Sequence, residues 1–255
     1  METKLNYKRT FLIGLAFLSI CSFWQMYDNI IPLILQNTYH LGETMTGAVM
    51  ALDNVLAIFL LPVFGTLSDK VHTKLGRRMP FIVSGTILAV IFMMLLPMID
   101  NAEKARWGTV ESFSNQVIFL AVLFFTLVSM GLYRSPAVAL MPDVTPNHLR
   151  SRANAVINLM GAVGGVYALI MIKVLVGKGE TPDYLPLFAS IAAVMAIAVG
   201  ILVITIRENK LREEVEKAEA ANAGTIEEKA MAEGVEAAGE IEAVGDTGEV
   251  KACLL

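Results

Sequence analysis

Two aspartates and one arginine lie inside long apolar segments of this sequence, where ionisable side chains are rare. Asp28, Asp53 and Arg134 are the residues that fall well inside such segments. A charge near the middle of a membrane-spanning helix costs roughly 2.5 to 3.5 kcal/mol, so each position is a candidate for function. Two carboxylates in one region can share a proton or a cation. The residue types therefore favour cation-coupling chemistry at Asp28 and Asp53.

The depths of these charges distinguish between two pairings. Measured along each helix from the side of the N-terminus, Asp28 lies about 27 Å, Asp53 about 21 Å and Arg134 about 10 Å into the membrane. An ion pair between Arg134 and Asp28 is therefore not expected, whereas the two carboxylates differ in depth by only about 6 Å. At that separation they repel by about 3 kcal/mol, which favours a shared proton or cation. The alternative is that each is a structural carboxyl, hydrogen-bonded to Asn29 or Asn54.

Other polar and aromatic groups lie within one helical turn of Asp28. Trp24 precedes it by four residues and Gln25 by three, so both share its helix face. An aromatic ring with a few polar groups is typical of a pocket for a sugar-sized solute. We therefore predict that Trp24, Gln25 and Arg134 bind substrate. The alternative for Trp24 is a place in the aromatic belt at the membrane interface.

The elements that position these residues are six apolar segments, each long enough to cross a bilayer. Hydrophobic residues make up 55% of the chain and charged residues only 17%. A membrane span needs about 20 mostly apolar residues, and segments without alternating polarity must be helices there. The sequence therefore predicts an all-α polytopic membrane protein, with helices over residues 10–35, 44–67, 80–99, 116–141, 153–176 and 184–206.

Charge divides the chain into two regions and predicts its orientation. Residues 208–255 carry 13 acidic and 5 basic side chains, whereas residues 1–207 carry 15 basic and 11 acidic ones. We expect a six-helix bundle over 1–206 and an acidic tail over 207–255, partly helical and then disordered. Ten lysines and arginines fall on the side of the N-terminus and four on the other side. Both termini are therefore expected in the cytoplasm, with the bundle in the plasma or inner membrane.

Several classes of function are not indicated. Cys21 and Cys253 lie far apart in the sequence, and His40, His72 and His148 stand in separate loops, so we expect no disulfide framework, metal site or cofactor. Nothing resembles a nucleotide-binding loop, and no nucleic-acid partner is expected. The glycines of "NLMGAVGGV", Gly161 and Gly165, form a GxxxG step that predicts close helix packing. The expected partners are the lipid bilayer and a small solute, and no enzymatic reaction is expected.

Two polar blocks separate the apolar segments in a recognisable way. The stretch "FGTLSDKVHTKLGRRMPF" contains Gly65, Asp69, Arg77 and Arg78, and "YRSPAVALMPDVTPNHLRSRANAVINLMG" contains Arg134, Asp143 and Arg150. The first resembles the loop between helices 2 and 3 of the major facilitator superfamily, with four extra residues before its final glycine. That longer form is closest to the sucrose-type and glycoside, pentoside and hexuronide cation symporters. The second block resembles the same superfamily's helix 4 to helix 5 region.

The resemblance implies a fold, a function and roles for the matched residues. It implies one half of a twelve-helix architecture, each half being a 3+3 inverted repeat. Gly65 would allow close helix approach, Asp69, Arg77, Arg78 and Arg150 would belong to an inner gate, and Asp143 would join Arg134 in a charge network. The implied function is secondary active transport of a small polar solute, a sugar or glycoside, coupled to H⁺ or Na⁺.

The absence of six further spans leaves the assembly open. The chain is expected to be a fragment, a half that pairs with a separate second half, or one member of a homodimer. A drug or metabolite exporter half and a non-transporting subunit acting through its acidic tail are the alternative functions. The sequence does not name the substrate, the coupling ion or the direction of transport.

Overall fold

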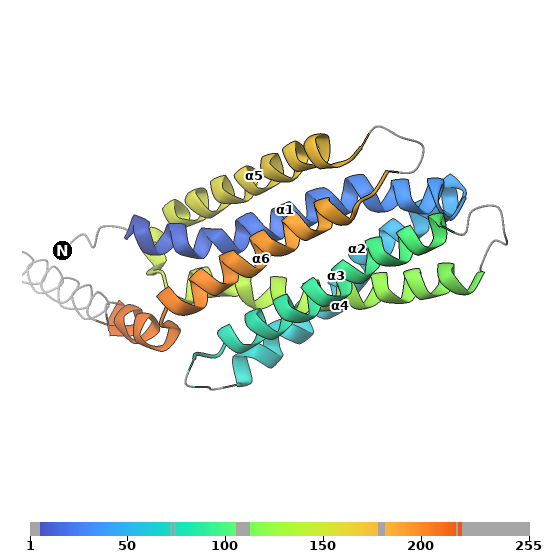
Figure 1. Ribbon diagram of the computed structural model, residues 1–255. Helices are drawn as coiled ribbons and strands as arrows, with labels where there is room; N and C mark the ends of the chain where they lie inside the picture. Colours follow the sequence, from blue (N-terminus) through green and yellow to red (C-terminus); the bar gives the residue numbers. More distant parts are fainter. Residues whose placement is uncertain are drawn as a thin grey trace, which may run out of the picture. The chain divides into compact units, whose positions relative to one another are not determined.

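The computed structural model describes residues 6–71, 73, 75–105, 113–177, 182–217 and 219–220. Within these residues the fold is helical, and the strand-like pairing is confined to an isolated bridge between Thr73 and Gly76. Figure 1 shows the long helices α1 to α6 as a bundle, with the short 3-10 turn η1 between α4 and α5. Their bounds are α1 Tyr7–Asn37, α2 Glu43–Lys70, α3 Met79–Lys104, α4 Phe113–Asp143, η1 Asn147–Leu149, α5 Arg150–Leu175 and α6 Leu185–Thr205.

The predicted all-α membrane fold is confirmed. Six helices of the described residues are long and apolar enough to cross a membrane, and each contains one predicted segment to within about one residue at its ends. Most run beyond the predicted apolar segments, because polar residues at both ends still satisfy their backbone groups within the helix. Asn6, for example, caps α1 by accepting a hydrogen bond from the Arg9 N–H at 3.3 Å.

The helices pack as two three-helix repeats. α1 packs against α5 and α6, while α4 packs against α2 and α3. If α1, α2 and α3 are exchanged with α4, α5 and α6 in that order, the contacts of α1 with α5 and α6 become those of α4 with α2 and α3. The contacts of α1 with α4 and of α3 with α6 are converted into themselves, and the smaller contacts of α1 with α2 and of α4 with α5 exchange with each other. The packing therefore has the pattern of the 3+3 repeat.

α1 and α5 approach each other closely at a glycine that the sequence did not single out. A Cβ atom on Gly164 would overlap the backbone of Leu18, and Ser22 Oγ donates a hydrogen bond to the Gly164 carbonyl at 2.9 Å. Of the two glycines in the predicted GxxxG step, Gly161 lies against Cys21, whereas Gly165 has no close backbone contact. The close approach thus uses the position next to the predicted one, because the interface follows the helix face and not the motif.

A buried polar cluster joins helices at the end of the bundle where α1 and α3 finish. Asp100 is fully buried and accepts hydrogen bonds from Thr38 Oγ1 at 2.7 Å and Lys104 Nζ at 2.6 Å. Lys104 also donates to the Pro182 carbonyl at 2.6 Å, which reaches the segment before α6. Its ammonium lies 4.4 Å from the centre of the Tyr184 ring. These contacts tie α1, α3 and α6 together.

The bundle continues a few residues beyond the predicted end of its last helix. The first compact unit runs from Met1 to Arg212, and the second from Glu213 to Leu255, whereas the composition places the division at 206. In the first unit the backbone breaks after α6 and becomes helical again from Glu208. In the second unit residues 213–217 are helical, and the tail beyond 220, with its predicted disorder, lies outside the described residues.

Candidate functional site

The loop between α2 and α3 ends in a tight turn. The Gly76 N–H donates to the Thr73 carbonyl at 3.1 Å, and Thr73 Oγ1 donates back to the Gly76 carbonyl at 2.5 Å. Gly76 has a φ of 123°, a value that residues with a side chain rarely adopt. A Cβ atom at this position would also overlap the carboxylate of Glu208. Glycine is therefore required here, and the turn presents Arg77 and Arg78 at the start of α3.

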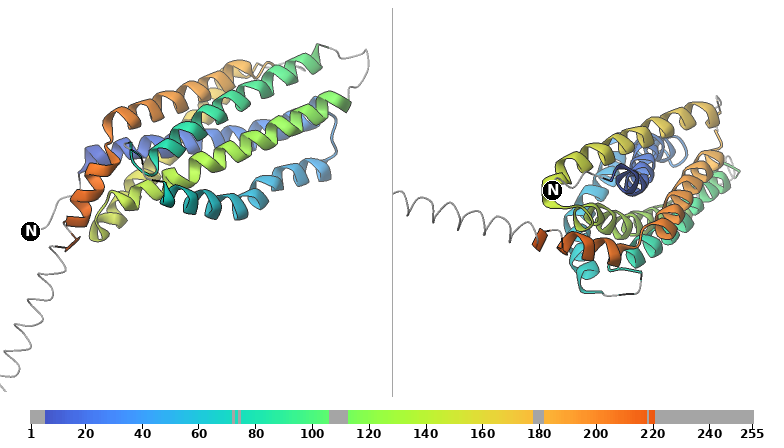
Figure 2. Two further views of the ribbon diagram at one scale, coloured as in Figure 1. Left: turned by 90° about the horizontal axis from the view of Figure 1, so that it is seen from below. Right: turned by 90° about the vertical axis from the view of Figure 1, so that its left-hand side faces the viewer.

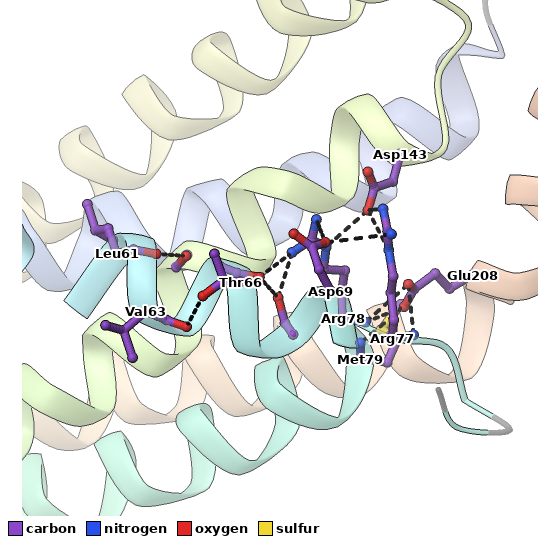
Figure 3. A network of polar contacts seen from close by, with 12 residues as sticks. Leu61, Val63, Thr66, Asp69, Arg77, Arg78, Met79, Asp143 and Glu208 are labelled. Atoms are coloured by element: carbon purple, nitrogen blue, oxygen red, sulfur yellow. Dashed lines mark hydrogen bonds and ion pairs between the residues drawn. The ribbon is translucent and has the colours of Figure 1, made fainter. Parts of the chain in front are cut away.

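The two arginines bind carboxylates from the ends of two other helices, as Figure 3 shows. Arg78 Nη2 lies 2.6 Å from Asp69 Oδ1 of α2, and Arg78 Nε lies 3.0 Å from Asp143 Oδ2 of α4. Arg77 Nη2 lies 2.8 Å from the same Asp143 oxygen, and its Nη1 is 3.6 Å from Asp69. We call Asp69, Arg77, Arg78 and Asp143 the arginine cluster. It joins α2, α3 and α4 at one end of the bundle.

Arg78 is the centre of the arginine cluster. Its side chain is only 6% exposed, and Nη1 donates to the Gly65 carbonyl at 3.2 Å and to Ser68 Oγ at 2.5 Å. Gly65 itself lies against Ser135 of α4, where a Cβ atom would come within 3.3 Å of the Ser135 hydroxyl. A buried guanidinium with several fixed acceptors is held in one orientation. Arg78 thus ties the last turn of α2 to the end of α4.

Glu208, just after α6, completes the arrangement, and the sequence reasoning missed it. It is 1% exposed, and its carboxylate accepts hydrogen bonds from the backbone N–H groups of Arg77, Arg78 and Met79 at 3.0 to 3.1 Å (Figure 3). These are unpaired donors at the first turn of α3, where the helix dipole favours negative charge. α3 has no acidic residue in its own first turn. Because α1, α4, α5 and α6 also lack one, this feature could not have pointed to Glu208.

The carboxylates also act on Arg77. Partial burial alone would lower the pKa of Arg77, but the hydrogen bond and charge of Asp143, with the charges of Asp69 and Glu208, raise it above its ordinary value. An arginine already keeps its proton at any physiological pH. Arg77 therefore stays charged within the arginine cluster.

Two residues of the predicted gate lie elsewhere. Arg150 donates to the carbonyls of Pro142 at 2.9 Å and Thr145 at 3.3 Å, so it braces the turn between α4 and α5 beside the arginine cluster. Arg134 does not make the implied contact with Asp143, whose carboxylate binds Arg77 and Arg78. The reason is distance, because nine residues along one helix separate Arg134 from Asp143 by about 13 Å.

Arg134 instead belongs to a small cavity in the middle of the bundle. Its guanidinium lies 5.4 Å from the centre of the Trp24 ring, a cation–π arrangement between α4 and α1. Trp24, Asp53 and Arg134 line one cavity of about 20 Å³, together with apolar side chains of α2 and α4. A cavity of that size holds a water molecule or an ion but not a sugar. The structure thus brings three of the predicted site residues together.

Asp28 and Gln25 lie beside this cavity without lining it. The two carboxylates are close enough for the charge of Asp53 to act on Asp28, which lies on an exposed surface of α1. Asp53 Oδ1 accepts a hydrogen bond from the Asn54 amide at 2.9 Å, whereas the Asn29 amide binds the Gln25 backbone carbonyl. The Gln25 side chain faces Gly165 of α5. Of the two aspartates, Asp53 is therefore the one whose carboxylate accepts a hydrogen bond from a neighbouring asparagine side chain.

Two unpaired polar groups lie in the same region of α1, and a third lies beyond its end at Tyr39. Among the buried side chains that the structure describes, Trp24 Nε1, Tyr27 Oη and Tyr39 Oη have no hydrogen-bond partner. Trp24 and Tyr27 contact each other edge to face, with ring centres 5.4 Å apart, and the charges of Asp53 and Asp28 act on the Tyr27 hydroxyl. Buried polar groups are rarely left unpaired outside binding sites. Tyr27, which the sequence reasoning overlooked, is thus an additional candidate.

Comparison with known proteins agrees with this geometry. A family profile described as Major Facilitator Superfamily matches residues 13–239. The chain is 26% identical over 137 residues to a sucrose transport protein, SUT3, of Oryza sativa subsp. japonica, covering 51% of the chain and 27% of the relative. It is 34% identical over 116 residues to sucrose transport protein SUC4 of Arabidopsis thaliana, covering 43% and 22%. An uncharacterized symporter of Synechocystis is 24% identical over 144 residues, covering 54% and 25%.

The alignments cover about a quarter of the length of these relatives. These relatives are named as sucrose transport proteins and as a symporter. The family match covers most of the bundle, including both polar blocks and every residue assigned to the site. This chain, whose described residues contain six helices long and apolar enough to span a membrane, belongs to the Major Facilitator Superfamily.

Proposed function

We propose that this chain forms one six-helix half of a secondary active transporter for a small polar solute of the sugar or glycoside class, coupled to H⁺ or Na⁺. The observation that carries the proposal is the meeting of Trp24, Asp53 and Arg134 around one cavity, with Asp28 in electrostatic reach. The names of the relatives, sucrose transport proteins and a symporter, support the solute class and the coupling.

The coupling step uses the two carboxylates. Asp53 lines a cavity that fits one water molecule or ion, and a second negative charge nearby favours the uptake of a proton or a sodium ion. Arg134 lines the same cavity, with its guanidinium against the Trp24 ring. A cation bound at Asp53 would repel this guanidinium, which would then turn to the hydroxyl groups of a solute. No tightly bound cofactor takes part.

The solute binds between this half and a second six-helix unit. The cavity in this chain is too small for a sugar, and the most apolar stretch of α2, the helix that carries Asp53, has no buried residue. Ile58 and Phe59 of α2 are 70% and 65% exposed, so this surface is available to a partner. Trp24, which lines the cavity, offers an aromatic ring to the solute. Rocking of one half against the other would expose the site alternately.

The arginine cluster forms one side of the gate. Its ion pairs join α2, α3 and α4 at the end of the bundle that carries most of the basic loops. We place this end, and both termini, on the cytoplasmic side of the cell membrane, because lysines and arginines collect there. Motion of α2 against α4 would break the contacts of Arg78 with Asp69 and Asp143 and change access from that side.

Uptake into vesicles tests the proposal. The full chain in lipid vesicles is supplied with radiolabelled sucrose under an imposed proton or sodium gradient. Asp53→Asn is expected to abolish gradient-driven uptake, because it removes the charge that binds the cation. Asp183→Asn, which alters an exposed carboxylate outside the spanning helices, is the matched control and should leave uptake unchanged. Equal uptake by wild type and Asp53→Asn would refute the coupling role.

A binding measurement covers the case in which a second half is needed for transport. The chain contains two tryptophans, so Trp107→Phe leaves Trp24 as the fluorescent reporter. Sucrose is expected to change the Trp24 emission, and Arg134→Gln should weaken that response. If neither uptake nor a change in Trp24 emission is found with sucrose, the chain is an exporter half or a non-transporting subunit. Removal of residues 213–255 then separates these two, because only the subunit depends on the acidic tail.

A further inference from the structure

An apolar groove runs between α3 and α6 on the outer surface of the bundle. Figure 2 shows these two helices side by side in both views. The groove has a volume of about 420 Å³, extends over residues 83–91 of α3 and 196–204 of α6, and is apolar apart from Thr86. The Thr86 hydroxyl donates to the Ile82 carbonyl at 2.7 Å, so it requires no outside partner. Nothing in the groove favours water or a polar ligand.

The groove lies at the depth of the lipid chains of one leaflet. Its residues occupy the first half of the membrane-spanning α3 and the last half of α6, which are the halves nearest the arginine cluster. Nine residues of helix give a length of about 12 Å, against roughly 30 Å for the hydrocarbon core of a bilayer. Inside a membrane such a space is filled by hydrocarbon, from a lipid or from another helix.

The dimensions favour a lipid chain over a helix. Dividing about 420 Å³ by about 12 Å gives a mean cross-section of about 35 Å². A helix with a diameter of about 10 Å has a cross-section of about 80 Å². The groove therefore has the proportions of a slot for a flexible chain, whereas a helix would enter it only with the side chains of one ridge. Gly200 widens it, because a Cβ atom there would meet nothing within 4 Å.

The end of the groove carries exposed positive charge. Ile204 is the last lining residue of α6, and Arg207 follows three residues later, within about 11 Å along the chain. Arg207 and Lys210 are both exposed, whereas the acidic residue between them, Glu208, is buried against the backbone of α3. A lipid phosphate at this level would therefore meet the two basic side chains and not the carboxylate.

We propose that the groove between α3 and α6 binds one acyl chain of an anionic phospholipid, whose phosphate is held by Arg207 and Lys210. The bound lipid fills the space between the third helices of the two repeats. It would thereby stabilise the contact of α3 with α6 in a bilayer that contains such lipids. The proposal rests on the membrane-spanning fold alone and does not depend on the solute or on the coupling ion.

Photo-crosslinking tests the site. The full chain is placed in phosphatidylcholine vesicles containing a small share of phosphatidylglycerol with a photoactivatable group in mid-chain, and labelled peptides are mapped. Labelling is expected in 83–91 and 196–204, and unlabelled phosphatidylglycerol should compete with it better than phosphatidylcholine does. Gly200→Leu, which fills the groove, should weaken labelling there by about tenfold. Gly47→Leu, an equally open helical glycine on α2, is the matched control and should not change it.

Variants of the two basic residues test the binding of the phosphate, and three other results would refute the proposal. Arg207→Gln with Lys210→Gln should remove the preference for phosphatidylglycerol while labelling by photoactivatable phosphatidylcholine remains. Labelling spread evenly over the exposed faces of the bundle, or insensitive to Gly200→Leu, would refute a bound lipid. A detergent-solubilised dimer that Gly200→Leu converts to a monomer would place a second copy of the chain in the groove and also overturn the proposal.

Discussion

The buried carboxylate of Glu208 offers a sharp test of how the loop before α3 is held. Its Oε1 accepts from the N–H groups of Arg77 at 3.0 Å and Arg78 at 3.1 Å, and its Oε2 accepts from those of Arg78 at 3.0 Å and Met79 at 3.1 Å. Glu208→Gln keeps the shape and one oxygen. It replaces the second oxygen by an amide group, which is a donor and would face the N–H groups of Arg78 and Met79.

The magnitude follows from the lost contacts. A hydrogen bond to a charged group contributes about 1.5 to 3 kcal/mol, and an anion at a helix N-terminus contributes up to about 2 kcal/mol when partly buried. Since these contributions overlap, we expect a total loss of about 2 to 4 kcal/mol. A loss of about 2 kcal/mol corresponds to a change of roughly thirtyfold in the local opening equilibrium.

Hydrogen exchange measured by mass spectrometry reads this opening directly. In the detergent-solubilised protein, the peptide that contains residues 77–79 should exchange roughly thirtyfold faster in Glu208→Gln than in wild type. Glu43→Gln is the matched control, because Glu43 is an exposed acidic residue in the first turn of α2. Its loss should cost less than about 1 kcal/mol.

Two exchange results would contradict the capping role of Glu208. Equal exchange of 77–79 in Glu208→Gln and Glu43→Gln would show that the carboxylate does not cap α3. Uniform acceleration in every peptide would mean that the substitution disturbs the whole bundle and not this helix start. Glu208→Asp separates the two causes, because a shorter carboxylate keeps the charge but cannot reach all three N–H groups.

Three further outcomes are expected. Gly76→Ala should lower stability by about 1 to 3 kcal/mol in thermal melts, because its backbone conformation disfavours a side chain. Ser19→Ala should cost about 1 kcal/mol by the same assay, since Ser19 Oγ lies 2.6 Å from the buried Tyr133 hydroxyl. The hydrogen bonds of Asn101 and of a backbone N–H lower the pKa of Asp183, so its contribution is present at neutral pH and is lost as the pH falls below about 4. Asn101→Ala should reduce this acid-dependent part of the melting temperature.

The helices were predictable because the bilayer imposes one strong rule on every segment that crosses it. A run of about 20 apolar residues must be a helix in lipid, so composition alone indicates the six elements and their approximate ends. Three charges of the arginine cluster were also visible, since Asp69, Arg77 and Arg78 lie within one short stretch. Local sequence carries local geometry.

Contacts between distant segments were not predictable in the same way. Glu208 binds a loop 129 to 131 residues earlier in the chain, and its position in an acidic tail hid it among solvated residues. Arg134 was assigned by resemblance to a charge network with Asp143 but contacts Trp24, because about 13 Å of helix separates it from Asp143. Tyr27 was overlooked because a buried hydroxyl without a partner shows only in three dimensions.

At each end of the bundle, a polar contact connects α3 with a segment next to α6. At one end, the carboxylate of Glu208, just after α6, accepts hydrogen bonds from backbone N–H groups at the start of α3. At the other end, Lys104, the last residue of α3, donates a hydrogen bond to the Pro182 carbonyl before α6. The contact of Glu208 pairs an anion with N–H donors, and the contact of Lys104 pairs a cation with a carbonyl oxygen. α3 and α6 cannot separate unless both contacts are broken, so these two helices should move together even when α2 moves against α4.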